Sequence, residues 1–97
     1  MKSAQAIENF LERAGGDERL LPSHFSLFLA IFHHSGEDAH APFSVSRRKL
    51  MAHSRLGSTA TYHKRISELA EFGYISYAPS FDPILASTIK IVSGDAG

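Results

Sequence analysis

The feature that most constrains the fold of this sequence is the order of helix starts and stops in its second half. Ser46 and Ser58 each stand before a helical pattern, where a serine hydroxyl can cap free backbone N–H groups. We predict a short helix over residues 47–53 and a second helix over residues 58–72, separated by a tight turn. Gly73 then ends the second helix, because glycine readily adopts the conformation that follows a helix.

A β-hairpin is predicted directly after this pair of helices. It joins residues 74–78 to residues 88–92 through a proline-containing loop, and residues 43–45 are placed to add a third strand. Upstream, helical spacing of apolar residues predicts helices over residues 3–14 and 24–35. The expected class is therefore α+β, with a three-helix core, a small antiparallel sheet and an extra N-terminal helix.

The chain divides into an N-terminal amphipathic helix within residues 1–16, a main domain over residues 22–92 and a flexible tail at residues 93–97. The apolar face of the first helix comprises Ile7, Phe10 and Leu11. These side chains need burial, either against the main domain or against a second copy. A homodimer formed through this helix is therefore one of our predictions.

Charge is unevenly distributed along a sequence that carries ten basic and ten acidic residues. Residues 39–67 contain six basic residues and no acidic residue, whereas the segments on either side each carry a net charge of −3. A basic segment can present a positive field to phosphate groups even in a neutral protein. The alternative is an ordinary solvated surface, and the position of the charges in the fold decides between the two.

Several classes of protein are excluded by composition. The sequence has no cysteine, so disulfide scaffolds and thiol enzymes are excluded. No apolar stretch is long enough to span a bilayer, and the N-terminal residues lack the order of a signal peptide, so we expect a cytoplasmic protein. A Gly-x-Ser-x-Gly motif is absent too. We therefore predict neither enzymatic activity nor a cofactor.

A run of histidines between residues 33 and 40 suggests a metal site at first sight. Zinc needs about four ligands in fixed directions. His33 and His34 are neighbours on a predicted helix, where adjacent side chains diverge by about 100°. We therefore expect no metal site.

Three stretches carry a resemblance: SHFSLFLAIF, VSRRKLMAHSRLGSTATYHKRISELAEFGYISYAPS and the downstream Ser87. Over residues 22–92 the sequence resembles small winged-helix DNA-binding proteins associated with bacterial mobile elements. The resemblance implies a winged helix-turn-helix fold and sequence-dependent binding of double-stranded DNA without a cofactor. The expected roles are a transcriptional regulator or a mobile-element accessory factor. The hairpin departs from the pattern, because Lys90 is its only basic residue.

The helix over residues 58–72 is the candidate reader of the major groove. Its outward face is small and polar near the N-terminus, and the predicted base contacts are Ala60, Thr61, His63 and Lys64. The predicted phosphate contacts are Arg47, Arg48, Lys49, Ser54, Arg55, Ser58, Arg65 and Lys90.

The cations that open the helix over residues 47–53 oppose the positive end of the helix dipole, and a bound phosphate would offset that cost. Tyr62 is either a core aromatic or a phenol that reaches phosphate, and its spacing to Ile66 and Leu69 favours the core. An interaction module that binds proteins and not DNA is the alternative function, because winged helices serve both purposes.

Overall fold

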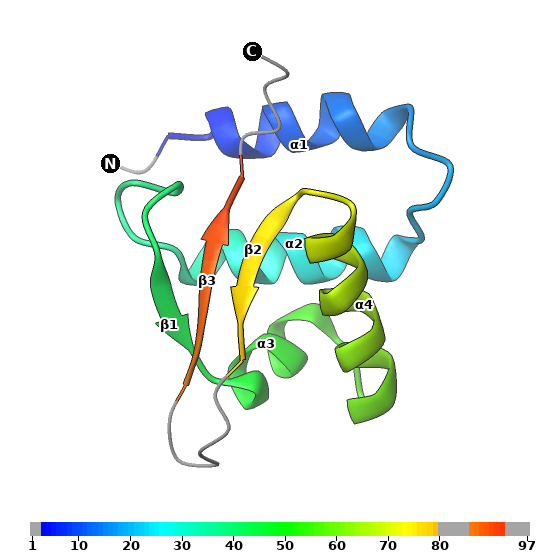
Figure 1. Ribbon diagram of the computed structural model, residues 1–97, viewed down its shortest axis with the longest axis vertical. Coiled ribbons are helices and arrows are strands. Elements are labelled where there is room, and N and C mark those ends of the chain that lie inside the picture. The colour runs from blue at the N-terminus through cyan, green and yellow to red at the C-terminus, as the bar shows by residue number, and fades with distance from the viewer. Residues whose placement is uncertain (1–2, 80–85, 93–97) are drawn as a thin grey trace.

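The computed structural model describes residues 3–79 and 86–92. These residues form four helices and an antiparallel sheet of three strands (Figure 1). In chain order the elements are α1 (Gln5–Gly15), α2 (Pro22–His34), β1 (Phe43–Val45), α3 (Arg47–Ser54), α4 (Thr59–Glu71), β2 (Ile75–Ala78) and β3 (Ser87–Ile91). The predicted α+β class is confirmed. The tail predicted at residues 93–97 and most of the hairpin loop lie outside the described residues.

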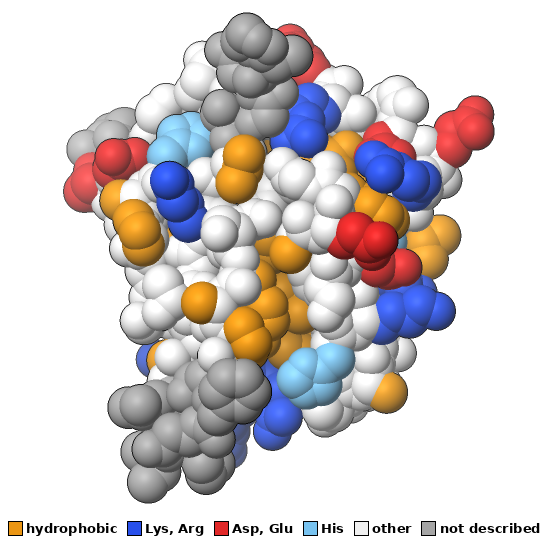
Figure 2. All heavy atoms as spheres, in the orientation of Figure 1, with side chains coloured by type: hydrophobic (Ala, Val, Ile, Leu, Met, Phe, Trp, Pro, Cys, Tyr) orange, Lys and Arg blue, Asp and Glu red, His pale blue; other side chains and the backbone are white. Residues whose placement is uncertain are grey.

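The sheet has the strand order β1-β3-β2, so β3 lies in the centre. Its pairing with β2 runs from Ile75 opposite Ile91 to Ala78 opposite Thr88, which confirms the predicted hairpin. β1 pairs with the other edge of β3, as expected for the third strand. Side chains of β3 alternate between the core and the solvent. The solvent face, seen in Figure 2, shows mostly polar side chains and backbone over the strands.

The core lies between the sheet and the helices, and α2 is its central helix. α2 contacts both α3 and α4, and it passes behind the sheet in Figure 1. The largest fully buried apolar side chains are Leu27, Phe28, Ile31, Leu50, Tyr62, Ile66, Leu69, Ile89 and Ile91. Burial of a large apolar side chain contributes about 1.5–3 kcal/mol. Tyr62, Ile66 and Leu69 are among these buried residues, which confirms the predicted inward face of α4. The residues on the opposite face of the helix therefore point outward.

α1 packs against the rest of the chain through a face different from the predicted one. Ala6, Phe10 and Ala14 are buried, whereas Leu11 is 50% exposed. The ring of Phe10 stacks on that of Phe28 with 3.8 Å between the centroids. Of the expected apolar face, Phe10 is buried, Ile7 is half-buried and Leu11 is exposed, so the burial is supplied in part by the main domain, one of the two predicted alternatives.

The helix ends follow the predicted caps at three of four places. Ser46 accepts a hydrogen bond from the backbone N–H of Lys49, and Ser58 caps α4 in the same way. Gly73 has φ of 85°, which a residue with a side chain adopts at a cost. α2 differs, because it begins at Pro22, two residues before the predicted start at residue 24. None of the described helices combines the length and apolar character that a membrane span requires.

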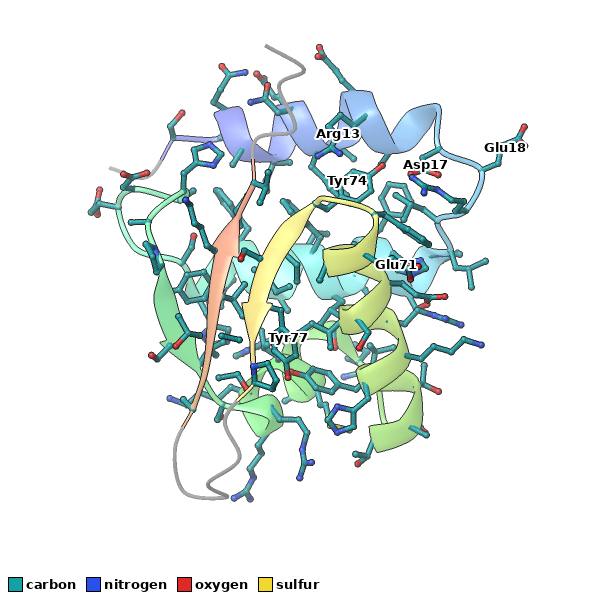
Figure 3. All side chains as sticks on the ribbon, viewed as in Figure 1. Arg13, Asp17, Glu18, Glu71, Tyr74 and Tyr77 are labelled. Atoms are coloured by element: carbon teal, nitrogen blue, oxygen red, sulfur yellow. The ribbon has the colours of Figure 1, made fainter. Side chains whose placement is uncertain are left out.

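The connection from α1 to α2 is held to the end of α4 by a docking cluster, defined as Arg13, Asp17, Arg19 and Tyr74 (Figure 3). The Tyr74 hydroxyl donates to a carboxylate oxygen of Asp17 over 2.8 Å. Arg19 donates to both oxygens of the same carboxylate, each over 2.8 Å. These bonds, first that from Arg19 and then that from Tyr74, hold the pKa of Asp17 well below its usual range.

The two arginines of the docking cluster also lie over aromatic rings. The guanidinium carbon of Arg13 is 4.1 Å from the Tyr74 ring centroid, and that of Arg19 is 4.0 Å from the Phe72 centroid. Arg13 in addition donates to the backbone carbonyl of Gly73. Each cation therefore has both a π face and an oxygen partner: Arg13 ties α1 to Gly73 and Tyr74, and Arg19 ties the connection after α1 to Phe72.

Candidate nucleic-acid interface

The N-terminus of α3 carries three consecutive cations. Arg47, Arg48 and Lys49 occupy the first turn, directly after the cap at Ser46, and all three are exposed. The free N–H groups of this turn give the helix end a partial positive charge. The positive field of the helix end and the three side chains therefore reinforce each other, and an anion such as phosphate would complement both.

The turn between α3 and α4 brings one of its two predicted contacts to the surface. Arg55 is exposed and adopts a left-handed conformation with φ of 65°. Ser54 belongs to α3 and not to the turn, and it is buried with its hydroxyl donating to the carbonyl of Met51. Ser54 therefore lies outside the exposed surface, because α3 is one residue longer than predicted and turns this side chain inward.

The N-terminal half of α4 presents the predicted base contacts. Ala60, His63 and Lys64 are exposed, and Thr61 is half-buried. The Ser58 hydroxyl accepts from the Thr61 N–H, so it caps the helix and remains exposed. The outward direction of this face follows from the burial of Tyr62 and Ile66 on the opposite side.

Arg65 has a different role from the exposed cations. Its Nε donates to the Ser23 hydroxyl over 2.8 Å, and its Nη1 donates to a carboxylate oxygen of Glu68 over 2.7 Å. The same oxygen is 2.9 Å from Nε2 of the buried His24. Because the Leu21 N–H donates to Nδ1 of His24, the ring proton is on Nε2 and points to Glu68. Arg65 was predicted to contact phosphate, but the structure shows it within this network.

The network also sets the ionisation of Glu68. Partial burial disfavours the charged carboxylate, but the hydrogen bonds from Arg65 and His24 outweigh it and lower the pKa of Glu68. An ionised Glu68 therefore holds α4 to the start of α2, where Ser23 and His24 lie.

Lys90 lies apart from the other predicted contacts. It is exposed in β3, opposite Ser76 of β2. β3 runs away from the end of the molecule where α3 and the N-terminus of α4 meet, and Lys90 is near its far end (Figure 1). The structure therefore does not bring Lys90 together with the cations of α3 and α4.

The remaining five cations form a cationic end, defined as Arg47, Arg48, Lys49, Arg55 and Lys64. None of them makes an ion pair within residues 3–79 and 86–92. Acidic side chains gather instead over the half of α4 that lies nearer β2, while basic side chains are visible beside α3 (Figure 2). The charge of α4 therefore differs between its two halves, with Lys64 in the N-terminal half and Glu68 and Glu71 in the C-terminal half.

Tyr62 belongs to the core and not to the exposed surface. Its side chain is fully buried, and its hydroxyl has no hydrogen-bond partner in the described part of the chain. Burial raises the pKa of the Tyr62 phenol well above its usual range, and the neighbouring Tyr77 raises it further. The core interpretation of Tyr62 is confirmed.

A second group of side chains was not expected from the sequence. His33 and His34 at the end of α2 lie beside His53 of α3, with one ring nitrogen from each within 4.8 Å of the others. His33 and His34 were expected to point in different directions because they are neighbours on a helix. Their imidazole rings nevertheless both lie close to the ring of His53 in α3. The sequence drew attention to His33 and His34 but not to His53, since the third histidine comes from another helix.

The exposed arrangement can bind a polyanion, since its cations share one end of the fold with two capped helix N-termini. Comparisons of the chain with protein-family models, with curated proteins and with solved structures found no match in any of the three. The function must therefore be inferred from the geometry and charge of the site.

Proposed function

We propose that this chain is a winged helix-turn-helix domain that binds double-stranded DNA and reads the major groove with α4. The observation that carries the proposal is the cationic end: five exposed cations without a carboxylate partner in the described residues, on two consecutive helices and their turn. The order α2, α3, α4 and hairpin, with β1 as a third strand, supports the same fold. Such a domain suits a transcriptional regulator or a mobile-element accessory factor.

Phosphate groups would be bound chiefly by α3 and the turn. Arg47, Arg48 and Lys49 surround a helix N-terminus whose N–H groups and dipole also favour an anion. Arg55 extends this surface on the turn toward α4. Phosphate contacts of this kind position a protein on the duplex and carry no sequence information.

Base edges would be read by the N-terminal half of α4. Lys64 can reach the acceptors of guanine, and Ala60 and Thr61 can meet thymine methyl groups in the major groove. His63 adds a ring nitrogen on the same exposed face. Glu68 and Glu71 lie toward the other end of the helix, which would leave the groove there because phosphates repel carboxylates.

Fluorescence anisotropy on a duplex selected from a random pool and on a scrambled duplex tests this division of roles. Lys64→Ala should cost about 1–3 kcal/mol on the selected site and reduce the preference between the two duplexes. Arg48→Ala should weaken both duplexes alike and lower the slope of log K against log salt by about one unit.

Lys90→Ala is the matched control, because it removes an exposed cation away from the cationic end and should leave both affinities unchanged. Equal affinities of the wild type, Lys64→Ala and Arg48→Ala would contradict the proposal. The cationic end would then be a solvated surface, and a protein-interaction module would explain the fold better.

A further inference from the structure

Three histidine side chains from two helices converge where the end of α2 meets the end of α3. The ring centroids of His33, His34 and His53 are 4.9, 5.0 and 4.8 Å apart in their three pairings. Nε2 of His34 is only 2.8 Å from Nδ1 of His53. His33 and His53 are exposed and His34 is half-buried, so the cluster lies at the surface of the protein.

The ligand atoms are close to the spacing that a metal ion requires. With Zn–N bonds of about 2.0–2.1 Å, tetrahedral geometry puts the ligand nitrogens about 3.3 Å apart. One ring nitrogen from each histidine lies within 4.8 Å of the others, and the 2.8 Å hydrogen bond between His34 and His53 is one that a bound ion would replace, with release of its proton. Small rotations of these side chains, none of which is fully buried, suffice to reach the tetrahedral spacing.

We propose that His33, His34 and His53 bind a divalent late transition-metal ion, with Zn²⁺ as the natural occupant. Imidazole nitrogen suits zinc, copper and nickel, whereas magnesium and calcium prefer oxygen ligands. Three protein ligands leave the fourth position of zinc for water or an outside ligand. The ion would link α2 to α3 at the end of α3 opposite Arg47, Arg48 and Lys49, and this inference does not depend on DNA binding.

Isothermal titration calorimetry of the untagged chain with zinc tests the site directly. We expect one Zn²⁺ per chain, similar binding of Ni²⁺ and no binding of Mg²⁺ at the same concentration. His53→Asn should weaken zinc binding at least tenfold, since even the loss of a group behind a ligand costs about 10–100-fold in metal affinity.

The matched control is His40→Asn, which makes the same substitution at a histidine outside the cluster. Nδ1 of His40 lies 3.0 Å from the Ile91 carbonyl oxygen, and an asparagine amide can still donate there. This variant should bind zinc as the wild type does. His34→Gln repeats the test at a second ligand, so the outcome does not depend on one variant folding.

Histidine-ring NMR signals provide a readout that records position and not only affinity. Zinc should shift the imidazole signals of His33, His34 and His53 together and leave those of His24 and His63 in place. An absence of heat and of ring shifts at about 100 μM Zn²⁺, a concentration that occupies any micromolar site, would overturn the proposal. Unchanged zinc affinity in folded His53→Asn and His34→Gln would overturn it too.

Discussion

The two ends of this molecule treat their charges in opposite ways. At the docking cluster, Asp17 is shared by Arg19 and Tyr74, and Arg13 lies over an aromatic ring. At the cationic end, five exposed cations have no carboxylate partner among the described residues. Basic side chains thus stabilise the packing of α1 against the turn after α4 at one end. At the other end, basic side chains are exposed without a carboxylate partner in the described residues.

The difference shows which charges the fold itself needs. Like charges on consecutive residues repel each other. A cation in the first turn of a helix also lies near the positive end of the helix dipole, which destabilises the helix by up to about 1 kcal/mol for each cation. The docking cluster has no such conflict, because Arg19 forms an ion pair with Asp17, and Arg13 donates to the Gly73 carbonyl and lies over the Tyr74 ring. Unpaired cations that oppose local stability are better explained by a ligand than by folding, which is the basis of the proposed DNA surface.

The largest expected effect tests the end where α1 is docked. Phe10→Ala should lower the free energy of unfolding by about 3–5 kcal/mol, because it empties the space between Phe28, Phe25 and Tyr74. Urea denaturation followed by circular dichroism measures the change. Leu11→Ala, one residue along and half exposed, is the control and should change stability little. Equal effects of the two substitutions would contradict the packing of α1.

A smaller and pH-dependent effect is expected at Asp17. Since its pKa is lowered in the folded chain, its ionised form stabilises the fold above the ordinary carboxyl pKa of about 3.9, and this contribution disappears as the pH falls through the folded pKa. Asp17→Asn should therefore be less stable than the wild type at pH 7, with the gap narrowing below about pH 4.

Tyr74→Phe should reproduce part of this pattern, because it removes one of the two side chains that donate to the Asp17 carboxylate. Thermal unfolding of the wild type and both variants across pH measures the gap. A gap that stays constant between pH 7 and pH 2 would show that the docking cluster is not electrostatic.

Arg55→Gly separates stability from binding at the cationic end. Glycine adopts the left-handed conformation of this residue without the cost of about 1–2 kcal/mol that a side chain incurs, so we expect a gain of about 1 kcal/mol in stability. The same substitution removes a cation and should lower the salt slope of DNA binding by about one unit. Arg48→Ala should lower the slope equally, with a gain in stability of about 0.3–1 kcal/mol because it removes a cation from the first turn of α3. Unfolding curves and salt titrations of both variants provide the comparison.

The smallest effect is expected for Tyr62→Phe, directly behind the exposed face of α4. Removal of a buried hydroxyl that lacks a partner in the described residues should stabilise the fold by up to about 1 kcal/mol. DNA affinity should not change, because the phenol does not reach the surface. A loss of affinity without a loss of stability would instead assign this hydroxyl to phosphate binding.

Local signals predicted much of the fold and part of the candidate site. The caps at Ser46 and Ser58, the stop at Gly73 and the buried face of α4 all depend on residues near one another in sequence. The hairpin pairing followed from two β-rich runs on either side of one loop. Such features can be predicted because a helix or hairpin fixes its own geometry.

Several of the features that sequence reasoning missed depend on contacts between distant segments. Leu11 belongs to the apolar face of α1 by spacing, yet the aromatic rings that receive the helix favour Phe10 with Ala6 and Ala14. Arg65 could be removed from the predicted phosphate contacts only once Ser23 was placed beside it. The three-histidine cluster likewise requires the packing of α2 against α3.

Under the proposed DNA-binding function, the Glu68 network has a consequence for the thermodynamics of binding. Its carboxylate joins the base of α4 to the start of α2, and the buried Ile66 and Leu69 fix the same half of the helix. A rigid reading helix loses little conformational entropy when it enters a groove, so more of the contact energy remains as affinity. A substitution that breaks this network would therefore weaken binding to every duplex alike. The free protein would be more disordered and would lose more entropy on binding, although no contact to DNA is removed.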